Sequence, residues 1–534
     1  MAILRQLRCL ARLSIAPFLS FFLFACYMND TPSRHQDLPL FNPHRPEFHC
    51  VYQDANVPPI DPQADAWFQE ALALDSPYLW SEERDYPKIV QRYTQAAERQ
   101  HWKAMMNLVS LQIEGRGLPR DPEAVVKRVE AAMQLGIPAA YDRMGTLYQR
   151  GIGVKGDATR AFAFFQRAAD MGSPESQTYL GEKMDATYDD PKGGFWGNKI
   201  IGQKMLQCAF AQGHGQAAFE LGLTTKKTGD REANARSLRY FHEGVKMGNA
   251  RSAAYLSREF GRPNLANTIN PGGIDKARGE RYRVFDNALD FNPLLRFPNL
   301  DAVLPLPPAR LPKWNGNKDD LLNAAKPVIM TPEPEVPLSS QRRGRSYLPA
   351  THKLIPMPSF GRTGMLHAPQ DGWYRPCHVA QPRAELERGM DLSSAIADVQ
   401  PGFYKKGEAF LRFRHPHIFL RDVDSVYWDR WEAVPVPPPL SDPRVRSGAW
   451  REVPRLEATL RCIDEPCTGT GVWQAFIARG HALIALVNQQ ARSQVWLTAG
   501  QAFPQPQQDW LLDLPTQDVH WFLMDADGVD ISQA

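Results

Sequence analysis

The fold is decided by residues 139–172, which read AAYDRMGTLYQRGIGVKGDATRAFAFFQRAADMG. In the first half of this stretch the apolar residues recur every three or four positions, which predicts a helix with one buried face. Gly151-Ile152-Gly153 interrupts that helix, because glycine accepts the positive φ at which helices end. Asp157 is a good N-cap for a second helix, and Gly172 follows the end of that helix. The stretch therefore predicts a pair of packed helices.

This helix pair has a copy 36 residues upstream. The matching positions are Gly115, Gly117, Asp121 and Gly136, which precede Gly151, Gly153, Asp157 and Gly172. More degenerate copies end near Gly213 and Gly248, and an upstream copy ends at Ala96-Ala97 with His101 in place of the glycine. Because a single pair leaves one face unburied, stacked copies predict an α-solenoid.

The repeat resembles the Sel1-like repeat, a relative of the tetratricopeptide repeat. The resemblance rests on three segments of the quoted stretch, Met144–Tyr148, Gly151–Val154 and Phe164–Ala169. It implies an α-solenoid over residues 80–260, with the least regular copies at 185–200 and 224–230. The residues expected to carry the repeat fold are Gly115, Gly117, Asp121, Gly136, Gly145, Gly151, Gly153, Asp157, Ala168 and Gly172.

Residues 1–25 have the features of an export signal. Three arginines and no acidic residue precede an apolar stretch at 13–25, which is too short to span a bilayer. The stretch ends in Leu23-Phe24-Ala25-Cys26, which resembles the lipobox of bacterial lipoproteins. The resemblance implies that Cys26 is lipidated and, because Tyr27 is not aspartate, that the anchor lies in the outer membrane and faces the periplasm. A plain secretory signal with an incidental cysteine is the alternative.

The net charge argues against some classes of function. The 534 residues carry a formal charge of +3, and removal of the leader leaves 59 basic and 59 acidic residues. A neutral chain argues against nucleic-acid binding, which normally needs a basic surface. The sequence holds no P-loop, no GxSxG or HExxH motif and no CxxC pair. We therefore expect no cofactor, no metal site and no catalytic residues.

Composition divides the rest of the chain. Residues 26–79 are expected to form an N-terminal tether and extension. Residues 261–369 hold a short helix at 274–289 and then a proline-rich connecting region, part of which is expected to pack along the solenoid. Residues 370–534 carry eight of the 13 tryptophans and are expected to form an α+β domain. Its elements are predicted as strands at 471–478, 493–499 and 519–524, with a helix at 481–492.

The cysteines predict one disulfide bond. Export to the periplasm permits disulfides, and Cys462 and Cys467 flank a turn that Pro466 favours. We therefore predict a bond between Cys462 and Cys467. Cys208 lies in an apolar helical pattern and is expected to be a small buried residue.

An aromatic and basic patch in the last domain is the predicted partner-binding site. Aromatic and arginine side chains dominate the energetics of many protein interfaces. The residues of the patch are Tyr404, Arg412, Arg414, Trp428 and Trp431.

The likeness to Sel1-like lipoproteins also implies a function. Such proteins resemble the immunity proteins encoded beside the lipase effectors of type six secretion systems. This resemblance implies a non-catalytic protein that binds a secreted phospholipase and blocks it sterically. Two alternatives remain open. One is an envelope hydrolase or peptidoglycan-binding protein with its active domain at 370–534, and the other is an adaptor for envelope assembly.

Overall fold

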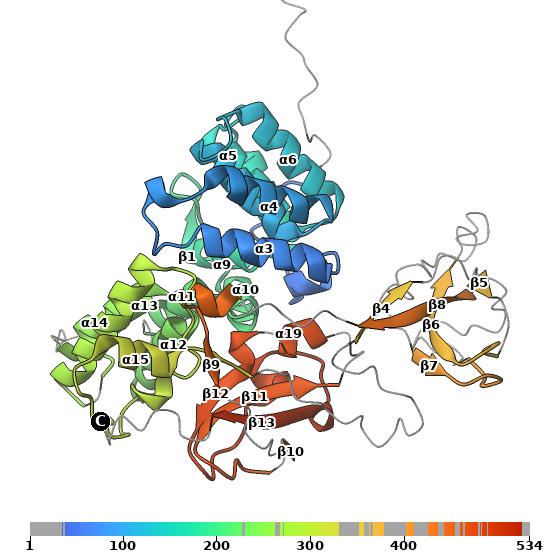
Figure 1. The fold of residues 1–534 in the computed structure, drawn as a ribbon. Coiled ribbons are helices and arrows are strands. Elements are labelled where there is room, and N and C mark those ends of the chain that lie inside the picture. The colour runs from blue at the N-terminus through green and yellow to red at the C-terminus, as the bar shows by residue number, and fades with distance from the viewer. Residues whose placement is uncertain are drawn as a thin grey trace, which may run out of the picture.

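The structure is a computed structural model. It describes residues 35, 38–226, 230–261, 268–270, 272–330, 352–356, 362–363, 367–378, 402–410, 426–435, 443–453, 460–462, 465–478, 481, 483–488 and 490–525. Figure 1 shows a curved array of helices, a sheet that lies beside the middle of the array, and a second sheet set apart from both.

Helices in consecutive, closely packed pairs form the array from residue 62 to residue 291. The pairs extend beyond the expected 80–260 on both sides, because the first and last helices pack on their neighbours like the others. The helices are α3 (Pro62–Leu74), α4 (Tyr86–Glu98), α5 (Trp102–Glu114), α6 (Pro122–Gln134), α7 (Pro138–Arg150), α8 (Ala158–Asp170), α9 (Pro174–Met184), α10 (Lys199–Ala211), α11 (Gly215–Lys226), α12 (Arg231–Lys246), α13 (Ala250–Gly261) and α14 (Lys276–Phe291).

Local sequence explains where the repeat helices begin and end. Asp121 and Asp157 accept hydrogen bonds from backbone N–H groups in the first turns of α6 and α8, as N-caps do. Gly115 and Gly151 end α5 and α7 with φ of 74° and 67°. Gly145 allows α7 and α8 to approach closely, since a Cβ there would lie 2.7 Å from the Phe165 ring.

The second glycine of each Gly-x-Gly turn has a different task. Gly117 lies against the start of α4, where a Cβ would be 2.9 Å from the Cβ of Tyr86. Gly153 lies against the start of α6, where a Cβ would collide with the Pro122 carbonyl group. These glycines therefore hold each turn against the preceding pair, so one pair packs on the next.

The turns after the second helices also need positive φ. Gly136, Gly172, Gly213 and Gly248 adopt φ between 73° and 103°. In the upstream copy Gln100 takes this conformation, with φ of 61°, and not His101. His101 is instead the N-cap of α5 and accepts a hydrogen bond from Ala104 N at 3.2 Å. The residue that replaces the repeat glycine is therefore Gln100, one position before the predicted His101.

An inserted hairpin explains the irregular copy at 185–200. Strands β1 (Asp185–Asp190) and β2 (Phe195–Gly197) pair antiparallel between α9 and α10. In the other irregular copy, α11 ends at Lys226, and residues 227–229 lie outside the described residues.

The proline-rich region packs on the last helix of the array, as predicted in part. Helix α14 covers the predicted helix at 274–289. The Arg278 guanidinium donates to the carbonyl of Pro305 at 3.0 Å, and that of Arg281 donates to the carbonyls of Val303 and Pro312. Arginine donors thus satisfy carbonyls that have no ladder partner. The segment continues through η3 (Leu300–Ala302) and α15 (Lys318–Ala325).

The region at 370–534 contributes to two sheets within the described residues, where the sequence predicted one domain. The sheet beside the array has the order β10-β13-β11-β12, all antiparallel, around the fully buried Trp473 and Trp521. The predicted strands are present, whereas the predicted helix at 481–492 is shorter. The elements are β10 (Leu460–Cys462), β11 (Gly471–Ile477), α19 (Ile484–Asn488), η6 (Ala491–Ser493), β12 (Gln494–Leu497), α20 (Pro506–Asp509) and β13 (Val519–Asp525).

The second sheet begins before residue 370. Its order is β4-β8-β6-β7, and β5 also pairs with β8. A short parallel pair of strands joins β3, which follows α15, to β9, which follows the second sheet in sequence. These elements are β3 (Val328–Met330), β4 (His352–Pro356), β5 (Arg362–Thr363), β6 (Gly372–His378), β7 (Gly402–Tyr404), β8 (Val426–Pro435), α18 (Pro443–Arg446) and β9 (Arg451–Val453).

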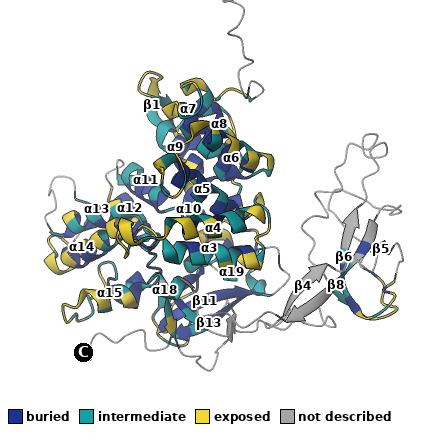
Figure 2. Ribbon diagram, turned by 45° about the horizontal axis from the view of Figure 1, so that its top comes forward, coloured by how far each residue is buried: buried dark blue, intermediate teal, exposed yellow. Residues whose placement is uncertain are grey.

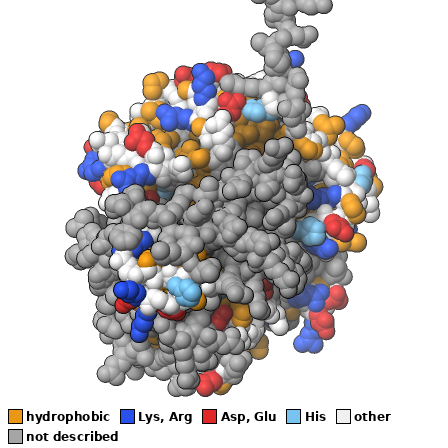
Figure 3. All heavy atoms as spheres, turned by 90° about the vertical axis from the view of Figure 1, so that its right-hand side faces the viewer, with side chains coloured by type: hydrophobic (Ala, Val, Ile, Leu, Met, Phe, Trp, Pro, Cys, Tyr) orange, Lys and Arg blue, Asp and Glu red, His pale blue; other side chains and the backbone are white. Residues whose placement is uncertain are grey.

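Burial follows this arrangement. Figure 2 shows buried residues concentrated where neighbouring helices face one another, with exposed residues on the outer helix faces. On the face in Figure 3, basic and acidic side chains are interspersed over the helices, in keeping with the balanced charge of the chain. No helix of the described residues is long and apolar enough to cross a membrane.

Candidate protein-binding groove

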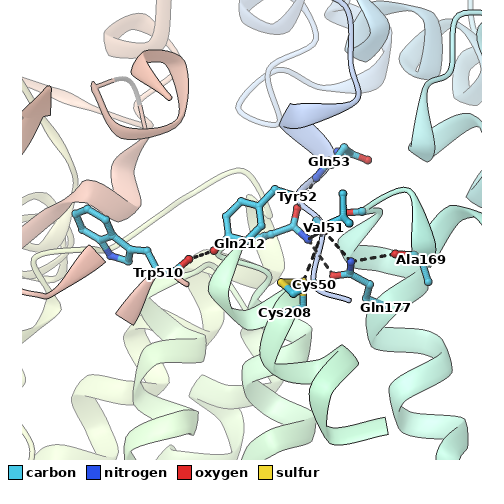
Figure 4. The surroundings of a disulfide bond; sticks show 10 residues. Cys50, Val51, Tyr52, Gln53, Ala169, Gln177, Cys208, Gln212 and Trp510 are labelled. Carbon is cyan, nitrogen blue, oxygen red and sulfur yellow. Dashed lines mark hydrogen bonds between the residues drawn. A yellow bond between two sulfur atoms is a disulfide. The ribbon is translucent and has the colours of Figure 1, made fainter. Parts of the chain in front are cut away.

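The chain before α3 lies across the helical array. We call residues 38–57 the N-terminal strap. A disulfide bond joins Cys50 in the strap to Cys208 in α10, across 158 residues of sequence (Figure 4). The carbonyl of Val51 accepts a hydrogen bond from Gln177 Nε2 of α9 at 3.1 Å. The strap is therefore tied to two helices of the array by a covalent bond and by polar contacts.

The strap also joins the array to the four-stranded sheet. The Tyr52 hydroxyl donates to the carbonyl of Trp510, and the Tyr52 ring belongs to the same buried cluster as Trp473 and Trp521. Burial raises the pKa of Tyr52 to about 12, so the hydroxyl keeps its proton and remains a donor. At Tyr52 the strap is thus a buried structural element that links the array to the sheet.

The predicted disulfide between Cys462 and Cys467 is wrong. Cys467 is a free, buried thiol, and its Sγ donates to the carbonyl of Thr498 at 2.9 Å. The cysteine that the helical pattern predicted to be merely buried, Cys208, is buried and forms the disulfide. The prediction paired two cysteines that are close in sequence. The bond that forms joins Cys208 to Cys50, which is distant in sequence and is brought to α10 by the strap.

The two ends of the helical array meet. Tyr78 lies in the loop between α3 and α4, and its ring lies 5.3 Å from the ring of Phe291 in α14, centre to centre. The curvature of the array therefore brings its first and last pairs together. We call this contact the seam.

A groove lies along the seam between α14 and α15. It has a volume of about 520 Å³. On the α14 side, the lining residues are three or four positions apart in sequence. On the α15 side, they recur about every four positions. The lining residues are Tyr78, Val284, Asn287, Ala288, Phe291, Leu295, Lys318, Asp319, Leu322, Asn323 and Lys326. We call this the seam groove.

Large apolar side chains stand exposed around the seam groove. Tyr78 is 53% exposed, Phe291 is 55% exposed and Trp80 is 76% exposed. Leu79 and Leu294, next to them in sequence, are exposed as well. A cluster of exposed large apolar residues of this kind marks an interaction surface on a soluble protein.

The loop that carries Tyr78 and Trp80 is held in place by polar contacts. Arg84 pairs with Asp75 at 3.0 Å and donates from Nε to the carbonyl of Leu79 at 3.2 Å. The backbone N–H of Trp80 donates to Glu83 at 2.9 Å. The exposed aromatic residues therefore stand on a fixed loop, which reduces the entropy lost when a partner binds.

One lysine of the groove is partly withdrawn from water. Burial lowers the pKa of Lys326, and the nearby charge of Asp319 opposes this effect. Within the described residues its Nζ donates one hydrogen bond, to Asn323 Oδ1 at 3.0 Å. Lys318, at the other end of α15, is exposed. Two ammonium groups therefore flank the apolar floor.

Two of the three described residues in the predicted partner-binding patch are buried. Tyr404 and Trp428 are 2% and 9% exposed and pack in the core of the second sheet, so they are not available as binding anchors, contrary to the prediction. Trp431 is half-buried, with the Arg375 guanidinium over its ring. Arg412 and Arg414 lie outside the described residues.

The seam groove was not predicted from the sequence. A local signal was available in Tyr78-Leu79-Trp80, three large apolar residues in a row outside any helical pattern. The residues of α14 were predicted only as a short helix at 274–289. Among the described residues, no group of three His, Cys, Asp or Glu side chains is placed to hold a metal ion.

Two family models match separate parts of the chain. A model of the Sel1 repeat matches residues 138–173, and a model of a domain of unknown function, DUF6396, matches residues 252–335. Pseudomonas aeruginosa PA5086, of known structure, is 34% identical, with 95% of that chain and 49% of this one covered and a TM-score of 0.40. The chain belongs to this family of Sel1 repeat proteins. No curated protein matches it.

Two further solved structures carry functional names. The immunity protein Pa5087 from Pseudomonas aeruginosa is 33% identical, and the immunity protein PA5088 from the same organism is 30% identical. In each case 95% of that chain and 49% of this Sel1 repeat protein are covered, with a TM-score of 0.41. The DUF6396 match includes both helices of the seam groove.

Proposed function

We propose that this Sel1 repeat protein is a lipid-anchored immunity protein that binds a secreted phospholipase in the periplasm and blocks it. The observation that carries the proposal is the identity of 33% and 30% to two immunity proteins, over 95% of their chains. The exposed apolar seam supports a protein partner, and the balanced charge of the chain suits a protein rather than a nucleic acid.

The mechanism is steric. A preformed surface that buries Trp80, Phe291 and Leu294 against the partner gains affinity from apolar area removed from water, at roughly 25 cal/mol per Å². A phospholipase must place its active site on a membrane. A bulky solenoid bound beside that active site keeps the enzyme off the bilayer, with no chemistry of its own.

The proposed anchor sets where the inhibitor acts. The residues between Cys26 and the strap extend at most about 40 Å, which keeps the helical array close to the membrane surface. A phospholipase in the periplasm attacks lipid at that surface. The anchored inhibitor then shares the same thin layer as its target, which raises its effective concentration.

The proposal predicts that a secreted phospholipase is encoded beside the gene, and the experiment is protection against that enzyme. A bacterial host exports this enzyme to its periplasm, with or without the full Sel1 repeat protein. We expect growth with the full chain and no growth with residues 26–534 alone, which lack the leader and stay in the cytoplasm. Purified protein that neither binds the enzyme nor lowers its activity would overturn the proposal.

The lipid anchor has its own test. With Cys26 intact, we expect the protein in the membrane fraction and labelled by radioactive palmitate. Cys26→Ser removes the acceptor thiol, so the variant is expected in the soluble fraction without label. Cys467→Ser, a buried thiol elsewhere in the chain, is the matched control and is expected to leave labelling unchanged.

A further inference from the structure

We propose that the seam groove binds an amphipathic helix of the partner, with carboxylates beside its apolar stripe. The proposal rests on the proposed function, because it names the part of the partner that is recognised. It is argued from the two stripes of the groove, from its backbone chemistry and from its lysines.

The floor of the groove has the geometry of a helix-binding surface. Val284, Ala288 and Phe291 on α14 are spaced by three and four residues, and Leu322 projects from α15 between the two lysines. Two neighbouring helices present ridges and grooves into which the side chains of a third helix fit. Both helices belong to one buried apolar cluster, so the two walls of the groove are held together.

The lining also determines which backbone conformation of a bound peptide can have all its backbone hydrogen bonds formed. The groove is lined mainly by side chains of α14 and α15, and among the described residues no strand belongs to its lining. An extended peptide would bring unpaired N–H and C=O groups against Val284, Ala288 and Leu322, with no strand edge to pair them. A helix satisfies its own backbone and needs only an apolar stripe.

The lysines select the charge of the occupant. Lys326 is half-buried and gives one hydrogen bond to the neutral amide of Asn323, within the described residues. A partly desolvated ammonium gains most from an ionised acceptor. Lys318, at the start of α15, lines the groove as well, and Asp319 is the acidic group among the lining residues. The groove therefore favours glutamate or aspartate on the rim of the bound helix.

The test uses defined probes. Three labelled 16-residue peptides carry the same leucine stripe at three- and four-residue spacing, flanked by glutamate, by lysine, or by glutamate in scrambled order. Fluorescence anisotropy with residues 26–534 is expected to show the ordered glutamate peptide binding about tenfold more tightly than the other two. Equal affinity for all three peptides, or no binding of any, would overturn the proposal.

Matched variants locate the binding. Phe291→Ser and Lys326→Glu are expected to weaken the glutamate peptide about tenfold each, and Lys326→Glu is expected to improve the lysine peptide. Ile200→Ser and Lys199→Glu make comparable changes, apolar to serine and lysine to glutamate, at exposed positions at the start of α10 and are expected to have no effect. Circular dichroism and the thermal midpoint check that Phe291→Ser remains folded. Unchanged binding in the two groove variants would place the peptide elsewhere and contradict the proposal.

The outcomes also separate this inference from the proposed function. If the wild-type chain protects and both Phe291→Ser and Lys326→Glu still protect, the immunity function is supported and the groove is refuted as its binding site. Failure of the wild-type chain to protect, together with the expected peptide preference, refutes the immunity function and leaves the groove standing. A dimer on gel filtration that Phe291→Ser converts to a monomer would assign the groove to a second copy and overturn the proposal.

Discussion

Gly153 and Gly136 have similar backbone conformations and different surroundings. Their φ angles are 66° and 73°. A Cβ on Gly153 would collide with the Pro122 carbonyl, whereas a Cβ on Gly136 would meet no atom within 4 Å. The two residues thus separate the cost of a positive φ from the cost of a blocked contact between repeats.

We predict that Gly136→Ala costs about 1 kcal/mol and Gly153→Ala at least about 3 kcal/mol of stability. The first change adds only conformational strain, and the second also pushes the turn away from α6. Thermal unfolding followed by circular dichroism measures both. Equal shifts in the midpoint would show that the second glycine of the turn is not needed for the packing of one pair on the next.

A second prediction at this scale concerns pH. Burial, together with the charge of Glu175, raises the pKa of Asp142 to about 6. The folded-state pKa therefore lies above the unfolded value, so the stabilising effect of the protonated form is complete below about pH 4 and is lost as the pH rises through 6.

Asp142→Asn keeps an acceptor for the hydroxyl of Ser176, which donates to Asp142 at 2.6 Å, and removes the buried charge. We expect the variant to be more stable than the wild type at pH 8, by up to about 3 kcal/mol, and no more stable at pH 4. The thermal midpoint measured across this range checks the sign. A difference that does not change with pH would refute the assignment.

The strap is the element that sequence periodicity did not reveal. The repeat was predictable because its N-caps and positive-φ glycines act within a few residues of each other. The Cys50–Cys208 bond was not, because it depends on an extended segment that crosses α9 and α10 and has no repeating pattern. The groove was hidden for the same reason, since Tyr78 and Phe291 are 213 positions apart.

We predict that the disulfide contributes up to about 5 kcal/mol, because it closes a loop of 158 residues. A thiol reductant should lower the thermal midpoint of the wild type. The double variant Cys50→Ser, Cys208→Ser should have a lower midpoint from the start and no further response to the reductant. Cys467→Ser should respond like the wild type. A wild type that is insensitive to the reductant would contradict the structural role of the bond.

For the whole molecule, the arrangement of the parts depends on a few junction residues. Arg492 in η6 donates to the carbonyl of Asp509 at 3.0 Å, and its side chain lies against the turn at Gly213 between α10 and α11. Burial lowers its pKa, while the Tyr52 hydroxyl of the strap opposes this effect. One side chain therefore contacts the sheet, the array and the strap.

We predict that Arg492→Ala loosens the four-stranded sheet from the array without unfolding either part. Small-angle X-ray scattering should show a larger radius of gyration, and trypsin should cut between the parts sooner. Arg310→Ala, at an exposed position, is the control and should leave both measurements unchanged. An unchanged radius in Arg492→Ala would mean that the apolar contacts alone hold the sheet in place.

The strap has a mechanical consequence. Tension on the chain before Cys50 is borne first by contacts of the strap such as the Arg45–Asp170 ion pair with α8, and beyond them by the disulfide, which carries it into Cys208 on α10. Once those contacts yield, the disulfide carries the load past helices α3 to α9, which lie inside the covalent loop although they come first in sequence. The first half of the array and the loop with Tyr78 and Trp80 can therefore keep their shape while the N-terminus is pulled.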